Sequence, residues 1–365
     1  MSTIRLDVVY VQYVQLAGSV KGSINYFVAI VTYNELSPIK KEHAMKIKDF
    51  LHLTFKEYEG NPIIAPPFPS PIIADPTFVP PNESPDGKWH LFAHSLMGIH
   101  HFVSDDGINY TRMSKHTIGN AMRAFLYYED NTYYLYYEKI KPYILWYSWL
   151  PHTWYSYIAM RSSHDLYSWS DEQIILKPSL PWHSNTFGAS VSNPCVVKTK
   201  QSYFLYYSAA LTNIQDCGFN EPLYIGLAQS SNPAGPFQSL PQPIMEPSHY
   251  NRWCNIGCGS FKALKMDDGF IGLQNGIYWD YTINQSGSAI LVYSSKDGIH
   301  YTPLMKNPLL KPDIKEGSYK RSHVYAFDLK QVDKNHWYLY FNARNNWHWS
   351  KGKEHIALLI GSKTS

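Results

Sequence analysis

Residues 133–138 read Tyr-Tyr-Leu-Tyr-Tyr-Glu, and runs of the same aromatic character recur along the chain. Aromatic and β-branched residues favour strands, so each run predicts one strand. A pattern that repeats along a chain is typical of repeat architectures. The other four copies, each after a short polar turn, are Lys88–His94, Tyr203–Ser208, Phe270–Asn275 and Trp337–Asn342.

Two further signals repeat in the same order. The first is a turn after a strand, seen as Ser104-Asp105-Asp106-Gly107 and Ser295-Lys296-Asp297-Gly298. Equivalent turns begin at Ser163, Ser231 and Gly361, and the steps between copies are 59 to 68 residues. Asp-Gly and Asn-Pro pairs form turns for backbone reasons. The second is a proline-punctuated tail, at Asn61–Pro66, Ile174–Pro178, Pro243–Pro247 and Asn307–Pro312.

Together these signals predict an all-β fold, a five-bladed β-propeller of four-stranded blades. The tail at 61–66 precedes the first blade, and the fifth blade reaches the end of the sequence. A strand near 53–58 is therefore expected to complete the last blade and remove an open sheet edge. A stacked β-sandwich with irregular loops is the alternative architecture.

Residues 1–50 lie outside the repeat and are predicted to form an extension, with 51–365 as the propeller. Two apolar, β-branched stretches, 7–16 and 26–33, predict a hairpin, and 38–51 predict a short amphipathic helix. We expect this extension to serve as a packing or dimerisation arm, so a homo-oligomer is one expectation.

Composition limits the classes of partner. Of 365 residues, 17% are charged and 16% aromatic, which excludes a disordered chain, and the net charge of +3 does not favour nucleic acid or an anionic membrane. No segment has the roughly 18 apolar residues of a membrane helix, and no secretory signal is recognised, which predicts a cytoplasmic protein.

The four cysteines, Cys195, Cys217, Cys254 and Cys258, are expected to be buried thiols; one disulfide in an exported protein is the alternative.

Polar residues at two equivalent places in each repeat predict a central pocket. The innermost strands of a propeller start near the axis, so polar residues there and at the ends of the aromatic strands are expected to converge. Polar strand ends are also common without any function, which is the alternative. The strand ends are His94, Glu138, Ser208, Gln274, Asn275 and Asn342, and the inner-strand starts include Asp75, Arg123, Asn193 and His323.

The motif Ala74-Asp75-Pro76, with the Tyr-Tyr-Leu-Tyr-Tyr strands of later repeats, resembles family 43 glycoside hydrolases and their five-bladed furanosidase relatives. The resemblance covers roughly residues 60–365 and implies a sugar-cleaving site with three carboxylates. Asp75 matches the base in the first blade. Where the family has Arg-Asp-Pro, this sequence has Arg123-Ala124-Phe125, and Ser192-Asn193-Pro194 occupies the place of the acid Glu.

Glycoside hydrolysis needs an acid and a carboxylate on opposite sides of the scissile bond. We expect Asp75 to activate water and Glu138 to be the acid, with His323 as an alternative acid or the holder of a central ion. Arg123 is expected to bind a substrate carboxylate or hydroxyls. Structural readings compete: Asp75 as a turn cap, Glu138 paired with Lys139, and histidines in the pocket wall.

Other residues complete the predicted substrate site. A loop containing Trp146 and Trp149 is a natural platform for stacking a sugar, or alternatively a contact between subunits. Arg344 is expected to bind substrate or brace acidic groups, and the loop with Asp216 and Glu221 is another source of an acid. The 16 histidines show no paired metal spacing, and no nucleotide-binding motif is present, so no cofactor is expected beyond a cation on the propeller axis.

The sequence thus favours a glycosidase acting on a furanose or related sugar, with carbohydrate as its partner. Because two family carboxylates are replaced, a non-catalytic glycan-binding propeller, or a sugar-recognition module of a transferase pathway, is the alternative. A protein-interaction propeller would instead have a flat face without an aromatic-lined hole.

Overall fold

The computed structural model describes residues 45–113, 118–141 and 153–363. The chain divides into two units, Met1–Glu42 and His43–Ser365, and the described residues belong to the second. The predicted hairpin lies outside the described residues. Of the predicted helix, the described part contains α1 (Ile47–Phe50), with Ile47 and Phe50 buried. No helix among the described residues has the length and apolar character needed to cross a membrane.

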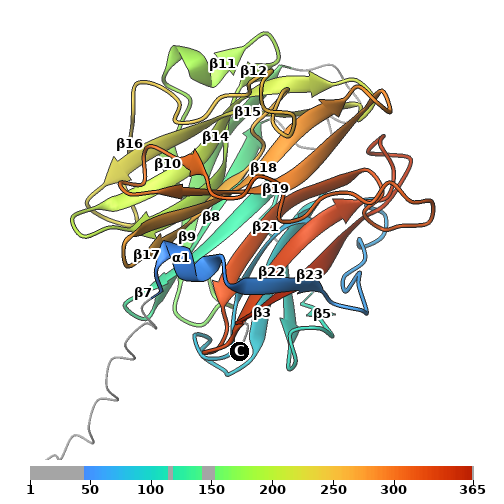
Figure 1. Ribbon diagram of the computed structural model, residues 1–365. Coiled ribbons are helices and arrows are strands. Elements are labelled where there is room, and N and C mark those ends of the chain that lie inside the picture. Colours follow the sequence, from blue (N-terminus) through green and yellow to red (C-terminus); the bar gives the residue numbers. More distant parts are fainter. Residues whose placement is uncertain (1–44, 114–117, 142–152, 364–365) are drawn as a thin grey trace, which may run out of the picture. The chain divides into compact units, whose positions relative to one another are not determined.

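The second unit is built from five antiparallel blades (Figure 1). Short strands β6 (Ile118–Gly119), β11 (Ser184–Asn185) and β12 (Gly188–Ala189) lie at blade margins, and η1 (Pro181–His183) is a single 3-10 turn. The blades, in order, are β2 (Ala74–Val79), β3 (Trp89–Ser95), β4 (Gly98–Ser104), β5 (Thr111–Arg112); β7 (Ala121–Glu129), β8 (Thr132–Lys141), β9 (Trp154–Ser163), β10 (Gln173–Leu176); β13 (Val191–Lys198), β14 (Tyr203–Ile214), β15 (Phe219–Ser230), β16 (Gln238–Ser239); β17 (Phe261–Met266), β18 (Gly269–Asp280), β19 (Gln285–Ser295), β20 (Thr302–Pro303); and β21 (His323–Gln331), β22 (His336–Arg344), β23 (Glu354–Lys363), β1 (Leu53–Glu57).

The fifth blade takes its outer strand from the other end of the propeller sequence. β1 pairs antiparallel with β23, with Leu53 opposite Lys363 and Glu57 opposite Leu359. The innermost strands contact one another around the axis: β2 lies against β7 and β21, and β13 lies against β7 and β17. The expected five-bladed β-propeller is confirmed.

The aromatic repeat ties neighbouring blades together. Tyr206 on β14 donates its hydroxyl to the carbonyl of Gly298 in the turn of the next blade (2.8 Å), and Tyr340 on β22 donates to Gly107 (2.7 Å). Tyr136 makes the same bond to Pro233. Each tyrosine stands two residues before the polar strand end of its blade. The ring fills the space between two sheets, and its hydroxyl satisfies a turn carbonyl across the gap.

The predicted Ser-x-Asp turns are closed by their own side chains. The Ser104 hydroxyl donates to Asp106 at 2.8 Å, and Ser295 donates to Asp297 at 2.9 Å. Each aspartate also accepts backbone N–H groups further along the turn, as in Ile108 N to Asp106 at 2.9 Å. These side-chain bonds explain why the same residue types recur at the outer turns.

A kink at the start of the inner strands positions the pocket residues. Asp75, Arg123 and Asn193 have left-handed φ angles of 52°, 54° and 48°, and Gly259 has the same conformation at 56°. In the first three blades the pairing with the next strand shifts at this point, which is the mark of a β-bulge. A bulge redirects a side chain, and here the same bulge recurs at the pocket end of successive inner strands.

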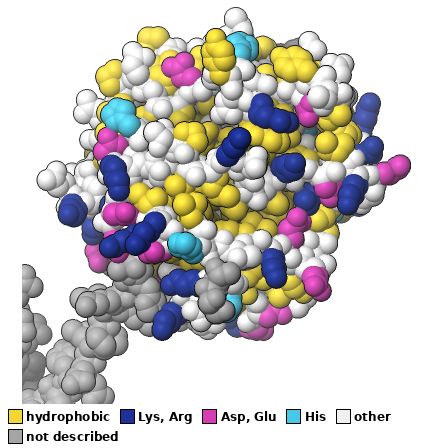
Figure 2. Space-filling view, in the orientation of Figure 1, with side chains coloured by type: hydrophobic (Ala, Val, Ile, Leu, Met, Phe, Trp, Pro, Cys, Tyr) yellow, Lys and Arg dark blue, Asp and Glu magenta, His cyan; other side chains and the backbone are white. Residues whose placement is uncertain are grey.

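The surface carries no large region of one charge on the face in Figure 2, where acidic and basic side chains are interspersed. Hydrophobic side chains gather in a band across the middle of this face. This distribution agrees with the small net charge of +3.

Candidate active site

One pocket lies where the repeated bulges converge. The pocket and the open solvent at its mouth together have a volume of about 630 Å³. All five blades contribute to its wall, so it occupies the axial position expected from the sequence. Its lining residues are Ile72, Ala74, Asp75, His94, Leu96, Met122, Arg123, Asn193, Phe219, Glu221, Gly259, Ser260, Asn275, Tyr325, Ala326, Asn342, Arg344, Trp349 and Glu354.

Asp75 presents a carboxyl group to this pocket from the bulge of the first blade. Its backbone N–H donates to Asn342 Oδ1 (3.1 Å), and its Oδ2 lies 3.3 Å from His94 Nδ1. Burial raises the pKa of Asp75 from 3.8 to about 7, although the positive charges of Arg123 and Lys262 oppose this. A carboxyl with this pKa exchanges a proton readily near neutral pH.

Arg123 separates two glutamates. Its Nη1 donates to Glu138 Oε2 at 2.8 Å, and its Nη2 lies 3.7 Å from Glu221 Oε2. Glu138 is fully buried, also accepts from Trp154 Nε1 at 3.3 Å, and is absent from the pocket wall. The expectation that Glu138 faces the pocket as the acid therefore does not hold, because Arg123 covers it. Its pairing partner is Arg123, whereas Lys139 contacts Glu172.

Glu221, unlike Glu138, has a place in the pocket wall. It lies near the start of β15, lines the pocket and has a side chain only 11% exposed. Burial raises the pKa of Glu221, while Arg123 and Arg344 oppose the rise. The sequence had marked this loop only as another source of an acid.

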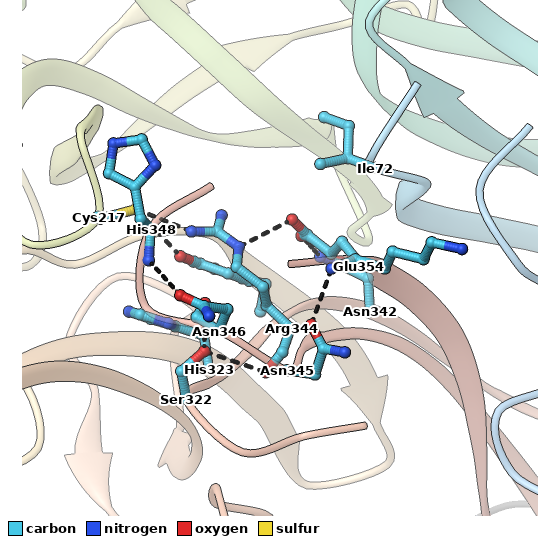
Figure 3. A network of polar contacts seen from close by, with 12 residues as sticks. Ile72, Cys217, Ser322, His323, Asn342, Arg344, Asn345, Asn346, His348 and Glu354 are labelled. Carbon is cyan, nitrogen blue, oxygen red and sulfur yellow. Dashed lines mark hydrogen bonds and ion pairs between the residues drawn. The ribbon is translucent and has the colours of Figure 1, made fainter. Parts of the chain in front are cut away.

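A third pocket carboxyl, Glu354, was not predicted. Its Oε2 accepts from Arg344 Nε at 3.2 Å, and its Oε1 accepts from the Asn342 amide (Figure 3). Arg344 also donates from Nη1 to the Cys217 thiol at 2.9 Å. Glu354 is the first residue of β23. It is followed by the partly buried His355 and then by the buried run Ile356–Leu359. A charged residue that leads into the apolar run Ile356–Ile360 is the signal that could have identified it.

His323 and His94 have different positions. His323 is buried and absent from the pocket wall, its Nε2 lies 3.1 Å from Ser286 Oγ, and its ring stacks on Tyr325. Burial lowers the pKa of His323 well below its usual range, so the ring stays neutral and cannot serve as the predicted acid. His94 does line the pocket, and burial lowers its pKa to about 3, so it contributes a neutral imidazole.

The remaining predicted residues either line the pocket, point elsewhere, or lie outside the described residues. Asn193, Asn275, Asn342 and Arg344 line the pocket, as His94 and Arg123 do. Ser208 and Gln274 do not, because Ser208 Oγ donates to Gly259 O (2.6 Å) and Gln274 Nε2 donates to Cys258 O (3.4 Å). Trp146 and Trp149 lie outside the described residues. The aromatic residues found in the wall are Phe219, Tyr325 and Trp349, which the sequence analysis had not selected.

No cluster of three His, Cys, Asp or Glu side chains able to hold a metal ion occurs in residues 45–113, 118–141 and 153–363. Lys262, from inner strand β17, is buried and donates from Nζ to the Pro194 carbonyl of β13 (2.8 Å). Its ammonium group places a positive charge between two inner strands, and burial lowers the pKa of Lys262. The axial cation remains a prediction.

Comparison with known proteins was made by sequence and by structure. No protein-family model matches the chain, and no curated protein matches it. An alpha-L-arabinofuranosidase from Podospora anserina, in complex with cellotriose, is 11% identical with a TM-score of 0.58, covering 83% of this chain and 95% of that one. An N-acetylgalactosamine deacetylase from F. plautii, in complex with blood group B trisaccharide, is 11% identical with a TM-score of 0.57, covering 85% and 96%.

A thermostable family-43 glycoside hydrolase is 12% identical with a TM-score of 0.53, covering 79% of this chain and 88% of that one. At such identities a structural likeness demonstrates a shared fold and leaves the chemistry to be argued from the site. The chain therefore has the five-bladed β-propeller fold that is found in family 43 and related glycoside hydrolases.

Proposed function

We propose that this protein is a glycoside hydrolase that cleaves a furanoside or related glycoside in the axial pocket. The observation that carries the proposal is the presence of two carboxyl groups with raised pKa values, Asp75 and Glu221, in the wall of one pocket. Perturbed acids that share a concave site are the feature expected of acid–base catalysis.

Asp75 and Glu221 take complementary roles in this proposal. Asp75, ionised, removes a proton from a water molecule as the water attacks the anomeric carbon. Glu221, protonated, gives its proton to the glycosidic oxygen as the C–O bond breaks. Arg123 lies beside Glu221, and its positive charge lowers the pKa of both acids, whereas the negative charge of Glu221 raises the pKa of Asp75, so ionisation of Glu221 disfavours ionisation of Asp75.

The site differs from the family pattern in where its carboxyl groups originate. In the motif resemblance, Ala124 stands where the family has the second Asp, and Ser192-Asn193-Pro194 stands where the family has the acid Glu. Glu221 and Glu354 enter instead from third strands, β15 and β23. Three carboxyl groups thus line the pocket, contributed by blades one, three and five.

The test is a panel of 4-nitrophenyl furanosides and pyranosides incubated with wild type, Asp75→Asn and Glu221→Gln. We expect Asp75→Asn to lower kcat by about 10² to 10⁴-fold on every cleaved glycoside. Glu221→Gln should lose less activity on a 2,4-dinitrophenyl glycoside than on an alkyl glycoside, because a good leaving group needs no proton. Exposed Asp171→Asn is the matched control and should keep wild-type rates. Full activity of Asp75→Asn would refute the assignment.

A non-catalytic glycan-binding propeller is the second candidate, favoured by the two family carboxylate motifs that this sequence replaces with Arg123-Ala124-Phe125 and Ser192-Asn193-Pro194. It predicts that oligosaccharides bind the pocket and are recovered uncleaved after days. Product detection by mass spectrometry decides between the two.

A further inference from the structure

The buried ammonium group of Lys262 lies near the axis of the propeller. Lys262 belongs to β17, the inner strand of the fourth blade. Its Nζ donates to the Pro194 carbonyl of β13 at 2.8 Å and lies 4.7 Å from the centroid of the Phe125 ring of β7. It also interacts electrostatically with Asp75 of β2 and Asp328 of β21. The group thus has partners on each of the other four inner strands, and a position near the axis explains this.

A second ammonium group, that of Lys330 on β21, lies among the same inner strands. Its Nζ donates to the carbonyl oxygens of Phe78 and Leu126, the latter at 3.3 Å, and lies 3.5 Å from Asp328 Oδ2. Both carbonyls stand three residues beyond the bulge of their strand, and therefore further from the pocket. Together the two lysines donate to backbone carbonyls of β2, β7 and β13.

The residues on the axis do not fit the metal ion that the sequence analysis allowed there. Hard cations such as Ca²⁺ bind carbonyl and carboxylate oxygens. On this axis, three inner-strand carbonyls accept from ammonium groups instead. A metal ion beside these groups would meet strong repulsion, because two positive charges a few ångströms apart repel in a buried site. In the parts of the chain that the structure describes, no cluster of His, Cys, Asp or Glu offsets this repulsion by offering three ligands.

Lys262 is kept as a cation by the charges around it. Burial lowers the pKa of Lys262, and the positive charge of Lys330 acts in the same direction. The carboxyl groups of Asp328 and Asp75 oppose this decrease. The neighbouring Cys195 is a neutral thiol at pH 7, because burial raises its pKa to about 11. Two carboxyl groups thus hold a proton on Lys262, and one of them belongs to the pocket.

The same charge acts on the pocket. The groups that face Asp75 are Arg123 on β7, Lys262 on β17, Glu221 on β15, Glu354 on β23 and the neutral His94 on β3. Burial raises the pKa of Asp75, whereas the positive charges of Arg123 and Lys262 lower it. The Arg123 guanidinium is paired with the Glu138 carboxylate at 2.8 Å, while Lys262 Nζ donates to a neutral carbonyl. The charge of Lys262 is therefore the less compensated of the two.

We propose that the Lys262 ammonium group is the resident cation of the propeller axis, in place of a metal ion, and that its charge favours the ionised form of Asp75. Lys262 is a positioning residue here, because it acts through Asp75. Only the catalytic meaning of the second part rests on the proposed function, in which ionised Asp75 activates water.

The first test uses the wild-type protein. Bound metals are measured by inductively coupled plasma mass spectrometry, and melting temperatures are compared in excess EDTA and in excess calcium chloride. We expect no stoichiometric metal and equal melting temperatures. A metal ion present at one per chain, whose removal by EDTA lowers the melting temperature, would overturn the proposal.

The second test compares Lys262→Met with Lys330→Met. Each variant loses one ammonium group and keeps an unbranched side chain, but Lys330 contacts β2 further from Asp75. The protonation of Asp75 is followed by NMR titration of its side-chain carboxyl ¹³C resonance, which Asp75→Asn identifies. We expect Asp75 to bind its proton about tenfold more tightly in Lys262→Met, and the change in Lys330→Met to be smaller.

Lys262→Gln provides the same comparison if Lys262→Met does not fold, because its amide keeps an N–H donor for the Pro194 carbonyl. Unchanged proton affinity of Asp75 in the neutral Lys262 variants contradicts the proposal, and so do equal changes in the Lys262 and Lys330 variants. Both tests are made without substrate. A metal-free protein with a Lys262-dependent Asp75 that cleaves no glycoside contradicts only the hydrolase proposal, and cleavage with a Lys262-independent Asp75 contradicts only this one.

Discussion

Asp75 combines a place in the pocket wall with a cost to stability. Its carboxyl group is 14% exposed, and burial raises its pKa from 3.8 to about 7. The folded state therefore binds more protons than the unfolded state between about pH 4 and pH 7. Stability contributed by the protonated form is lost as pH rises through this window.

Asp75→Asn should consequently be more stable than wild type at pH 8, by at most about 4 kcal/mol, because the amide carries no charge to bury. The difference should shrink to under about 1 kcal/mol near pH 4, where the folded carboxyl is protonated and the unfolded one is close to half protonated. Urea unfolding at pH 4, 6 and 8 measures it. A difference that does not change with pH would contradict the raised pKa.

Glu138 and Glu221 both contact Arg123, but we expect them to contribute differently to the stability of the fold. Glu138→Gln removes the close, fully buried partner of a buried guanidinium and should lower stability by about 3 kcal/mol at pH 7. Glu221→Gln should cost less, since Glu221 lies 3.7 Å from Arg123 and faces the pocket. Chemical denaturation of the two variants compares them, and equal losses would argue against the different roles described above.

At the scale of elements, the repeated bulge is the feature that builds the pocket. Gly259 has the same left-handed conformation in the fourth blade, with φ 56°, and an added Cβ there would lie 2.3 Å from the Asn275 carbonyl oxygen. Gly259→Ala should therefore lower stability by about 2 kcal/mol or more. Gly119→Ala is the control, because nothing lies within 4 Å of its added Cβ. Thermal unfolding of both variants tests this, and equal melting temperatures would show that the bulge relaxes freely.

The elements were also the most predictable part of the molecule. The five aromatic strands and the Ser-x-Asp turns follow local rules, namely strand propensity and side-chain-closed turns, so the sequence locates them directly. The sequence also places Asp75, Arg123 and Asn193 at the pocket correctly, because each lies near the start of an inner strand of the repeat.

The orientation of strand-end side chains was less predictable. His94 and Asn342 reach the pocket from the same register at which Glu138 and Ser208 are covered by neighbours. Tertiary contacts, such as the one between Arg123 and Glu138, decide which side chain is covered. The spacing of residues in the sequence does not reveal such contacts. Glu354 lies on the third strand of its blade, whereas the repeated polar pattern in the sequence marks only the first and second strands.

At the scale of the whole molecule, β1 is the strand that completes the ring of blades. A chain beginning at residue 45 retains α1 and β1, whereas a chain beginning at residue 59 exposes the edge of β23 and loses buried Leu53. We expect the first to melt like the full chain. The second should lose at least about 3 kcal/mol and aggregate through the free edge. Calorimetry and light scattering test this, and equal behaviour of the two chains would show that β1 is dispensable.

The pairing of β1 with β23 can form only late in biosynthesis, because the two strands lie far apart in the sequence. Residues 53–57 leave the ribosome long before residues 354–363 are translated. At about 5 to 20 residues per second, the nascent β1 waits roughly 15 to 60 s for its partner. A ribosomal complex stalled just after residue 303 has all the strands of the first four blades but only β1 of the fifth, so it should carry an open arc of blades with an unpaired edge that holding chaperones can recognise.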